Sequence, residues 1–373
     1  MLDLTAELSP VSGMPSVSPE WEDPARYWPR LSAATGHLPA PVAVIDREAL
    51  RFNAMDLLVR AGGLPIRVAS KSVRVRAVLD AVLALPGYRG ILAFTLAEAL
   101  WLARDHDDIV LGYPTVDRAG LAELFADEQA AARITLMVDD PVHLDVIDSV
   151  AAPGARPEVR VAIDVDASWR SAMLGHIGVR RSALFSAGEV AAFAHRIVAR
   201  PGFRLVGLQM YDAQIAGQGD DAGIDAPLIR MVQARSRGEL RERRAAIAEA
   251  VTAVVPLEFL NGGGTGSLEF TGSDESLTEA SAGSGLLGGH LFDGYRSFRP
   301  APAAAFAFDV VRRPTPDIAT VLGGGWIASG PAVASRQPRP VWPEGLRTLS
   351  REAAGEVQTP LQGRAAAALG GGG

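Results

Sequence analysis

One lysine and two glycine-rich segments are the residues of this chain best suited to chemistry. Lys71, in the stretch IRVASKSVRV, is the only lysine among 36 Lys and Arg residues. Arginine can replace lysine in surface charge and simple ion pairs, but only an amine can lose its proton and attack a carbonyl carbon. Lys71 is therefore a candidate for covalent chemistry. The alternative is that Lys71 escaped a general replacement of Lys by Arg by chance.

The two glycine-rich segments are NGGGTGSLEF, residues 261–270, and AGSG, residues 282–285. Glycines let a ligand approach the backbone closely, and hydroxyl groups with successive backbone N–H groups bind anions. The alternative is two tight turns that need glycine for its positive φ. A lysine and an anion cradle together suggest a cofactor with both an aldehyde and a phosphate group, and pyridoxal phosphate (PLP) has both.

Other motifs do not fit the residues. A Walker A loop needs glycine before the lysine, but Ser70 precedes Lys71. A dinucleotide-binding pattern fits Gly323, Gly325 and Ala328 only loosely, and its surroundings are β-rich. The six histidines contain no helical HExxH pair, so the residues by themselves predict no metal site.

Short apolar runs that alternate with helix-like segments indicate the elements that position these residues. The predicted strands are residues 41–46, 66–70, 91–95, 108–113, 133–139, 158–165, 203–211, 256–261 and 277–282. Helix-like spacing of apolar residues covers 72–85, 96–105, 141–150 and 237–254. Parallel strands buried on both faces are typical of this pattern. If the first strand pairs elsewhere, eight remain, which predicts an α/β fold of the TIM (β/α)8 barrel type. A doubly wound open sheet is the alternative.

This barrel places the chemistry at one end. Lys71 directly follows the first barrel strand, and the glycine-rich segments follow the seventh and eighth. Active sites of TIM barrels lie at the carboxyl ends of the strands, and the last two loops often bind phosphate. We expect an N-terminal arm over residues 1–40, the barrel over 41–299, and a smaller β-rich domain over 300–373 that is incomplete at its C-terminus.

Composition excludes several classes of protein. The 373 residues are 48% hydrophobic and 21% charged, which is typical of a globular protein, and the formal net charge of −7 disfavours nucleic acid as a partner. No apolar run reaches the roughly 18 residues of a membrane span, and the N-terminus lacks a signal-peptide pattern. Without cysteine the chain has no disulfide or thiolate site. We expect a cytoplasmic location.

Five motifs in one order resemble the alanine-racemase-like, fold-type III PLP enzymes: RVASKSVR, GLQMYDAQIAG, NGGGTGS, EASAGSGLLGGHLFDGYRSFRPAPA and GGGWIASG. Within this group the chain is most similar to the amino acid deaminase/aldolase branch, which is related to D-threonine aldolase and D-serine dehydratase. The resemblance runs from about residue 40 to residue 360 and implies a PLP-binding TIM barrel followed by a β domain.

The resemblance also implies roles for residues. Lys71 would carry the cofactor, and Tyr211 and Gln214 would face it, although Tyr211 could instead be a packing residue at the barrel rim. Where the family has an arginine beside the cofactor, this chain has His176, so that role falls to His176, to Arg170 or to neither. The cofactor phosphate would be bound by Gly263, Gly264, Thr265, Gly283 and Ser284.

The resemblance implies an enzyme that acts on an amino acid as a homodimer. Its relatives use a divalent metal, Mn or Zn, with a histidine near the C-terminus, but no histidine follows His290. The metal ligands would be expected beyond residue 365, where the chain reads AAAALGGGG, so either this segment is altered or the chemistry is metal-free. Residues 300–373 also lack the tyrosine that alanine racemases use.

Three functions are therefore open. The first is a lyase that cleaves or dehydrates D-β-hydroxy amino acids such as D-threonine or D-serine. The second is an amino acid racemase of unusual type. The third is a PLP-binding homologue without full activity.

Overall fold

The described residues form two compact units. The structure is a computed structural model and describes residues 2–5, 19–221, 223–325 and 333–369. Residues 2–5, 54–286 and 294–299 form the first unit, and residues 19–53, 287–293 and 300–369 form the second. Segments of the two units follow one another in turn along the chain, because residues 19–53 belong to the same unit as the C-terminal part. The domain limits expected at residues 40 and 299 stay a prediction.

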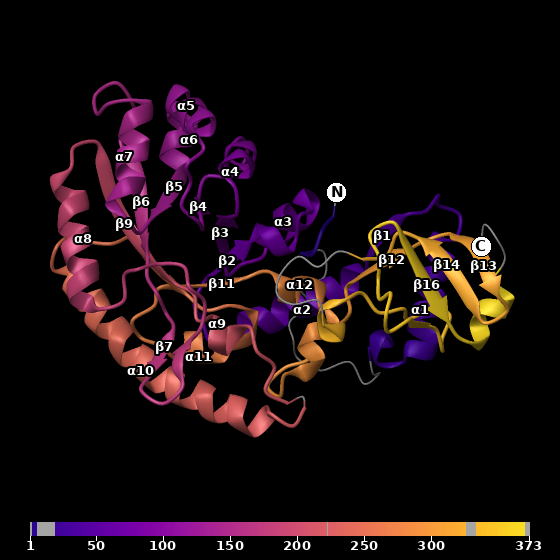
Figure 1. The fold of residues 1–373 in the computed structure, drawn as a ribbon. Helices are drawn as coiled ribbons and strands as arrows, with labels where there is room; N and C mark the ends of the chain where they lie inside the picture. Colours follow the sequence, from indigo (N-terminus) through magenta and orange to yellow (C-terminus); the bar gives the residue numbers. More distant parts are fainter. Residues whose placement is uncertain (1, 6–18, 222, 326–332, 370–373) are drawn as a thin grey trace. The chain divides into compact units, whose positions relative to one another are not determined.

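A closed barrel of eight parallel strands forms the first unit (Figure 1). Strand β11 closes it by pairing with both β10 and β2. The strands, in order around the barrel, are β2 Ile66–Ala69, β3 Tyr88–Ala93, β4 Ile109–Leu111, β5 Ile134–Val138, β6 Val159–Asp164, β9 Phe203–Met210, β10 Phe259–Gly262 and β11 Glu279–Ala282. The predicted TIM barrel is confirmed, and the open doubly wound sheet is wrong.

Helices lie outside the barrel strands, as α4 to α8 show in Figure 1. Their bounds are α2 Arg47–Arg60, α3 Arg76–Leu83, α4 Leu96–Leu102, α5 Arg118–Ala126, α6 Glu128–Arg133, α7 Pro141–Val150, α8 Ala187–Ala199, α9 Ala213–Ala216, α10 Ala226–Thr252, α11 Leu268–Gly272 and α12 Ser284–Leu287. Helix α8 begins with a capping box between Ser186 and Glu189. Between β6 and β9 the chain also forms a hairpin of β7 Trp169–Ser171 and β8 Gly175–Ile177.

Apolar side chains fill the barrel interior. Its core cluster contains Val110, Met137, Ala162, Val206 and Phe259. A Cβ atom at Gly207 would lie 2.3 Å from the ring of Phe259, so only glycine leaves room for this ring. The strands are buried on both faces by this interior and by the surrounding helices, which explains why most of their residues are apolar in the sequence.

A buried ion network lies in the barrel wall near the start of β2. The guanidinium of Arg67 donates to Glu279 on β11 through Nε at 2.7 Å and Nη2 at 2.8 Å. Its Nη1 donates to Asp108 at 2.7 Å, and Asn261 on β10 donates to Glu279 at 2.9 Å. The network therefore joins β2 to β10 and β11, the strands that lead to Lys71 and to the two glycine-rich segments.

The second unit is built around antiparallel sheets. Strand β1 Val42–Ile45 pairs with β12 Ala304–Ala307, so the first predicted strand does pair outside the barrel. A four-stranded sheet has the order β13 Val310–Thr315, β14 Ile318–Leu322, β16 Gln358–Gln362 and β15 Arg347–Thr348. Val310, Ala319, Val321, Leu346 and Ala366 form its core. The β-rich C-terminal part is therefore confirmed.

Two parts of the sequence analysis need comment here. Helix α1, Pro24–Thr35, lies in the segment expected to be an N-terminal arm, for which the sequence analysis predicted no helix. The prolines at 24 and 29 obscured the helical spacing, although proline is tolerated in the first turn of a helix. Residues 326–330 of the motif GGGWIASG, with Ala328, lie outside the described residues.

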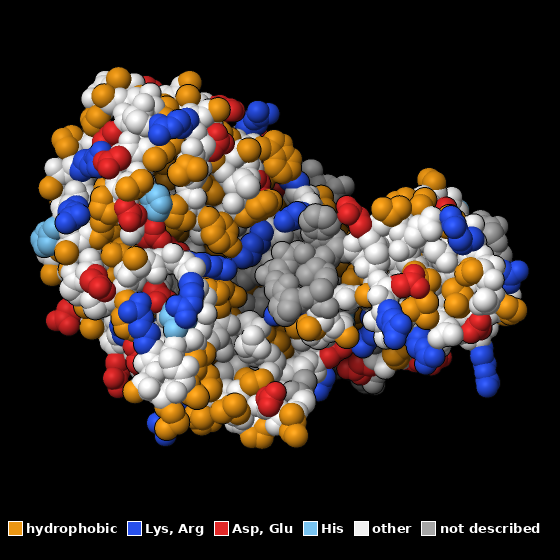
Figure 2. Space-filling view, in the orientation of Figure 1, with side chains coloured by type: hydrophobic (Ala, Val, Ile, Leu, Met, Phe, Trp, Pro, Cys, Tyr) orange, Lys and Arg blue, Asp and Glu red, His pale blue; other side chains and the backbone are white. Residues whose placement is uncertain are grey.

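On the face in Figure 2, acidic and basic side chains are interspersed, in keeping with the formal net charge of −7. None of the helices in the described residues is long and apolar enough to cross a membrane.

Candidate functional site

Lys71 stands directly after β2, in the 3₁₀ turn η2, Ser70–Ser72. The hydroxyl of Ser70 is buried and donates to Glu98 Oε2 at 2.9 Å and to the carbonyl oxygen of Leu92 at 3.2 Å. The backbone beside Lys71 is therefore anchored, while the Lys71 side chain is exposed. Its Nζ donates to the hydroxyl oxygen of Tyr113 at 2.6 Å.

Two tyrosine rings and an arginine lie next to this amine. Tyr113 follows β4, and Tyr211 follows β9. The guanidinium carbon of Arg181 lies 5.6 Å from the ring centre of Tyr113 and 5.1 Å from that of Tyr211. Within the described ranges Arg181 has no hydrogen bond or ion pair. An unpaired cation therefore lies over two aromatic rings, one of which is the partner of Lys71.

Close backbone contacts define the two glycine-rich segments. Gly263 has a φ of +78°, and a Cβ atom there would lie 2.2 Å from Thr271 Oγ1. A Cβ atom at Gly283 would lie 2.4 Å from the carbonyl oxygen of Ala69, two residues before Lys71. Both positions require glycine, and Gly283 brings the loop after β11 against the end of β2.

Hydroxyl groups join the two segments. Thr265 Oγ1 accepts a hydrogen bond from the backbone N–H of Gly285 at 3.1 Å and from Ser284 Oγ at 3.3 Å. A Cβ atom at Gly264 would lie 3.2 Å from the ring of Tyr211. Lys71, Tyr113, Arg181, Tyr211 and Gly264 are therefore successive neighbours at this end of the barrel.

Most of the predicted site residues thus lie at the carboxyl ends of the barrel strands, where TIM barrels carry their active sites. Those joined by these contacts are Lys71, Tyr211, Gly263, Gly264, Thr265, Gly283 and Ser284. Their individual roles stay predictions.

Gln214 has a different environment. Its Nε2 donates to the carbonyl oxygen of Ala167 at 2.7 Å and to Ser236 Oγ at 2.8 Å. The side chain therefore connects the loop after β6 to helix α10. Its Oε1 is buried and has no hydrogen-bond partner within the described residues. The predicted catalytic role of Gln214 stays a prediction.

His176 and Arg170 are both held by neighbouring loop residues. His176 lies on β8, with Nε2 3.1 Å from the carbonyl oxygen of Val179. Arg170 pairs with Asp166 at 3.1 Å and lies over the ring of Phe185. No contact between either residue and Lys71, Tyr113, Arg181 or Tyr211 is found among the described residues. A role beside the cofactor therefore stays a prediction for both.

A buried carboxyl group ends strand β6 at the same end of the barrel. Asp164 is 7% exposed, and its register partner on β9 is Gln209, whose Oε1 has no partner within the described part of the chain. Burial and the charges of Asp139 and Asp166 raise the pKa of Asp164 to about 7, against the opposing charge of Arg181. Asp164 can therefore take up or release a proton near neutral pH.

Three residues of this end of the barrel were missed in the sequence analysis: Tyr113, Asp164 and Arg181. A signal existed for two of them, because Tyr113 follows a predicted strand and Asp164 stands at the end of another. Arg181 had no such signal, since it lies on an irregular segment after the β7–β8 hairpin.

The residues present fit PLP. The amine of Lys71 is exposed at the barrel end, and the segments with Thr265 and Ser284 supply hydroxyl and backbone N–H groups for a phosphate. Among the described residues no group of three or more His, Asp or Glu side chains could hold a metal ion.

Comparisons with known proteins agree with this fold. No family model matches the chain. The chain is 27% identical over 291 residues to a D-threonine aldolase of an Arthrobacter species, which covers 74% of this chain and 69% of that protein. The solved structure of D-threonine aldolase from Filomicrobium marinum matches with a TM-score of 0.72 at 19% identity and covers 90% of this chain and 84% of that chain.

A second solved structure is D-threo-3-hydroxyaspartate dehydratase from Delftia, with a TM-score of 0.64, 20% identity and coverage of 88% of this chain and 85% of that chain. Alanine racemase from Clostridium difficile matches with a TM-score of 0.56 at 15% identity, covering 87% of this chain and 82% of that chain. At these identities the solved structures show the fold. By sequence the chain is similar to D-threonine aldolase, and its fold, a barrel with a β-rich part, is similar to that of the alanine-racemase-like structures.

Proposed function

We propose that the chain is a PLP-dependent lyase that acts on D-β-hydroxy amino acids such as D-threonine or D-serine, by aldol cleavage or by dehydration and deamination. The observation that carries this proposal is that the only lysine and the two glycine-rich segments lie at the same end of the barrel, with Tyr113, Arg181 and Tyr211 between them. The sequence relationship to D-threonine aldolase supports the choice of reaction.

In this function Lys71 holds the cofactor covalently through Nζ. Thr265 and Ser284 bind the phosphate with their hydroxyl groups, and Gly263, Gly264 and Gly283 let it approach the backbone. When bound, PLP supplies an electron sink that stabilises negative charge at the substrate Cα atom. The protein residues then decide which bond breaks, because they bind the substrate and move its protons.

Tyr113 and Arg181 have distinct tasks in this proposal. The Tyr113 hydroxyl lies 2.6 Å from Lys71 Nζ, within reach for a proton that leaves or returns to the amine. Arg181 lies over the rings of Tyr113 and Tyr211 and has no hydrogen bond or ion pair in the described ranges, so we assign it to the α-carboxylate of the substrate. A free amino acid has a carboxylate for Arg181 and an amine that can take the place of the Lys71 amine beside Tyr113.

Asp164 is the general acid or base at the same end of the barrel. Its pKa of about 7 lets it be protonated or ionised near neutral pH. A divalent metal, Mn or Zn, belongs to the proposal only through the resemblance, because the segment beyond residue 365, where the ligands would be expected, reads AAAALGGGG and has no side chain that binds a metal. A homodimer also belongs to it through the resemblance, and a cytoplasmic location through the composition.

The test is to purify the full chain with PLP and record its visible absorbance before and after borohydride. D-Threonine and D-serine are then supplied with Mn²⁺ or Zn²⁺, and the formation of aldehyde or keto acid is measured. We expect one product from at least one substrate, and we expect Lys71→Arg to lose both the absorbance and the product.

Three other outcomes would overturn parts of the proposal. Loss of optical rotation with an intact substrate skeleton would indicate the racemase. Bound cofactor without turnover of any D-amino acid would indicate the homologue without full activity. If Lys71→Arg kept the absorbance of bound cofactor, the assignment of Lys71 would be wrong.

A further inference from the structure

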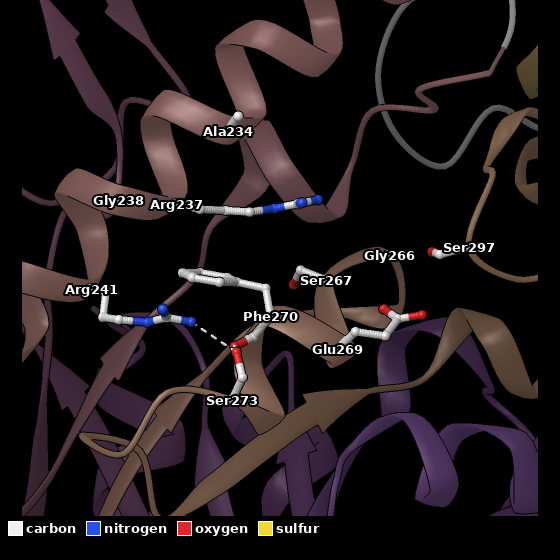
Figure 3. Close-up of a pocket in the computed structure, with 10 residues that line it drawn as sticks. All are labelled: Ala234, Arg237, Gly238, Arg241, Gly266, Ser267, Glu269, Phe270, Ser273 and Ser297. Carbon is white, nitrogen blue, oxygen red and sulfur yellow. Dashed lines mark hydrogen bonds between the residues drawn. The ribbon is translucent and has the colours of Figure 1, made fainter.

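A groove of about 480 Å³ lies beside helix α10 in the barrel unit, between this helix and residues 266–273, with Ser297 at its far side (Figure 3). In Figure 3 the side chains of Arg237 and Arg241 extend from α10 into the groove, above and beside the ring of Phe270. The volume is in the range of small-molecule sites.

Neither of the two arginines of this groove has an acidic partner among the described residues. They are one helical turn apart on α10, and both are exposed. Arg241 donates to Ser273 Oγ at 2.8 Å, and Arg237 has no hydrogen bond or ion pair within the described ranges. Other arginines of α10 differ, since Arg243 pairs with Glu239 at 2.6 Å. Like charges one turn apart repel each other, and an anion bound between them removes the repulsion.

The only acidic side chain in the groove wall is already neutralised. Glu269 accepts from Arg60 Nε at 2.7 Å and Nη2 at 3.1 Å, and the Arg60 side chain is 6% exposed. Burial opposes the charge of Glu269, but the hydrogen bond and charge of Arg60 outweigh burial and hold its pKa below the ordinary value. The groove therefore has a positive balance in a chain whose formal net charge is −7.

One turn of the backbone forms both the groove wall and the predicted phosphate cradle. Gly266 and Ser267 line the groove, and they belong to the 3₁₀ turn that begins at Thr265. Ser267 Oγ accepts from the backbone N–H of Gly264 at 3.1 Å and donates to Asp212 Oδ1 at 3.0 Å. A shift of Ser267 caused by a ligand in the groove would therefore be transmitted to Gly264 and Thr265.

We propose that this groove is a second anion site, which binds a small oxyanion of the phosphate class through Arg237 and Arg241. The hydroxyl of Ser273 donates to the carbonyl oxygen of Phe270 at 2.8 Å and that of Ser297 to Glu269, so the two guanidinium groups are the donors of this site. Occupation of the groove changes the affinity for the cofactor through the turn at residues 264–267. The binding step does not depend on the proposed function, whereas the effect on the cofactor rests on it.

The experiment measures inorganic phosphate binding to the full-length holoenzyme by calorimetry in a phosphate-free buffer, so that the cofactor occupies its own phosphate site. We expect one phosphate per chain and at least a ten-fold loss of affinity in the double variant Arg237→Gln with Arg241→Gln. Arg235→Gln is the matched control, because Arg235 is an exposed arginine of the same helix that does not line the groove. The control should bind as tightly as the wild type.

Equal phosphate binding by the double variant and the wild type would overturn the site, and so would an equal loss in the control. A second measurement follows the release rate of the cofactor with and without phosphate. We expect a phosphate effect that the double variant loses. If both proteins bind cofactor but phosphate affects their release rates equally, the coupling is wrong. If neither protein binds cofactor, the proposed function fails, and calorimetry with the cofactor-free chain still tests the groove.

Discussion

Replacing Arg67 with methionine tests whether the buried ion network supports the site end of the barrel. The side chain of Arg67 is 2% exposed, and that of its partner Glu279 is 6% exposed. Arg67→Met keeps most of the side-chain volume but leaves the carboxylate of Glu279 in the barrel wall with the Asn261 amide as its one remaining donor among the described residues. Asp108 is less affected, because its side chain is 37% exposed and Arg89 lies nearby.

The expected loss follows from the burial of these groups. Removing one partner of a buried ion pair costs about 3–5 kcal/mol, because the remaining charge is buried without compensation. The whole free energy of unfolding of a domain is about 5–15 kcal/mol, so this loss is a large fraction of it. In the double variant Arg67→Met with Glu279→Leu no buried charge remains at this position, and we expect at least half of the loss to be recovered.

The assay is urea unfolding of the full chain followed by circular dichroism, with cofactor affinity as a second readout because β2 leads directly to Lys71. Arg204→Met is the control, since Arg204 is 49% exposed and pairs only with exposed carboxylates. We expect about 0–1 kcal/mol for the control. The reasoning would be refuted if Arg67→Met were no more destabilising than Arg204→Met, or if the double variant were less stable than Arg67→Met.

Three further predictions concern the site. Because the pKa of Asp164 is raised from about 3.9 to about 7, its stabilising contribution is present below pH 4 and lost as the pH rises to 7; Asp164→Asn should remove this loss, measured as the urea midpoint from pH 5 to 8. Gly283→Ala places a Cβ atom 2.4 Å from a carbonyl oxygen of β2 and should weaken cofactor binding at least ten-fold in a spectroscopic titration, whereas Gly188→Ala, with open space around it, should not. Arg181→Met should raise the KM for D-threonine about 10- to 100-fold by removing a charge-assisted hydrogen bond of about 1.5–3 kcal/mol, with little effect on cofactor affinity or on turnover of the corresponding amino alcohol. Arg180→Met is its exposed control, and equal KM values in both variants would contradict the role of Arg181.

The barrel strands could be predicted because burial on both faces leaves a local signal. Strands such as β5 and β9 are continuous apolar runs in the sequence, and nearly every residue of them is buried in the structure. Helix α1 was missed because Pro29 lies inside it and its spacing is irregular. Its position in the second unit depends on contacts such as that of the Tyr27 hydroxyl with the carbonyl oxygen of Pro302, which are remote in sequence.

Part of the candidate site could also be predicted from local features of the sequence. Lys71 and the glycine-rich segments were found because rare residue types and glycine clusters are visible in one dimension. Arg181 was not found, because an arginine among so many others carries no signal. Its importance comes from its position over Tyr113 and Tyr211 and from its charge, which acts on the carboxyl group of Asp164.

The sequence by itself determined the fold class, because strand periodicity is a local property of the chain. Glycine clusters and a single lysine are local as well, and they predicted the cofactor type and the residue that would carry it. Only the tertiary structure decided which groups surround that lysine. Closure of the barrel brings Tyr113, Arg181 and Tyr211 from three separate segments to the same end as Lys71. Burial at that end raises the pKa of Asp164, and this effect depends on the packing around the carboxyl group and not on its neighbours in sequence alone.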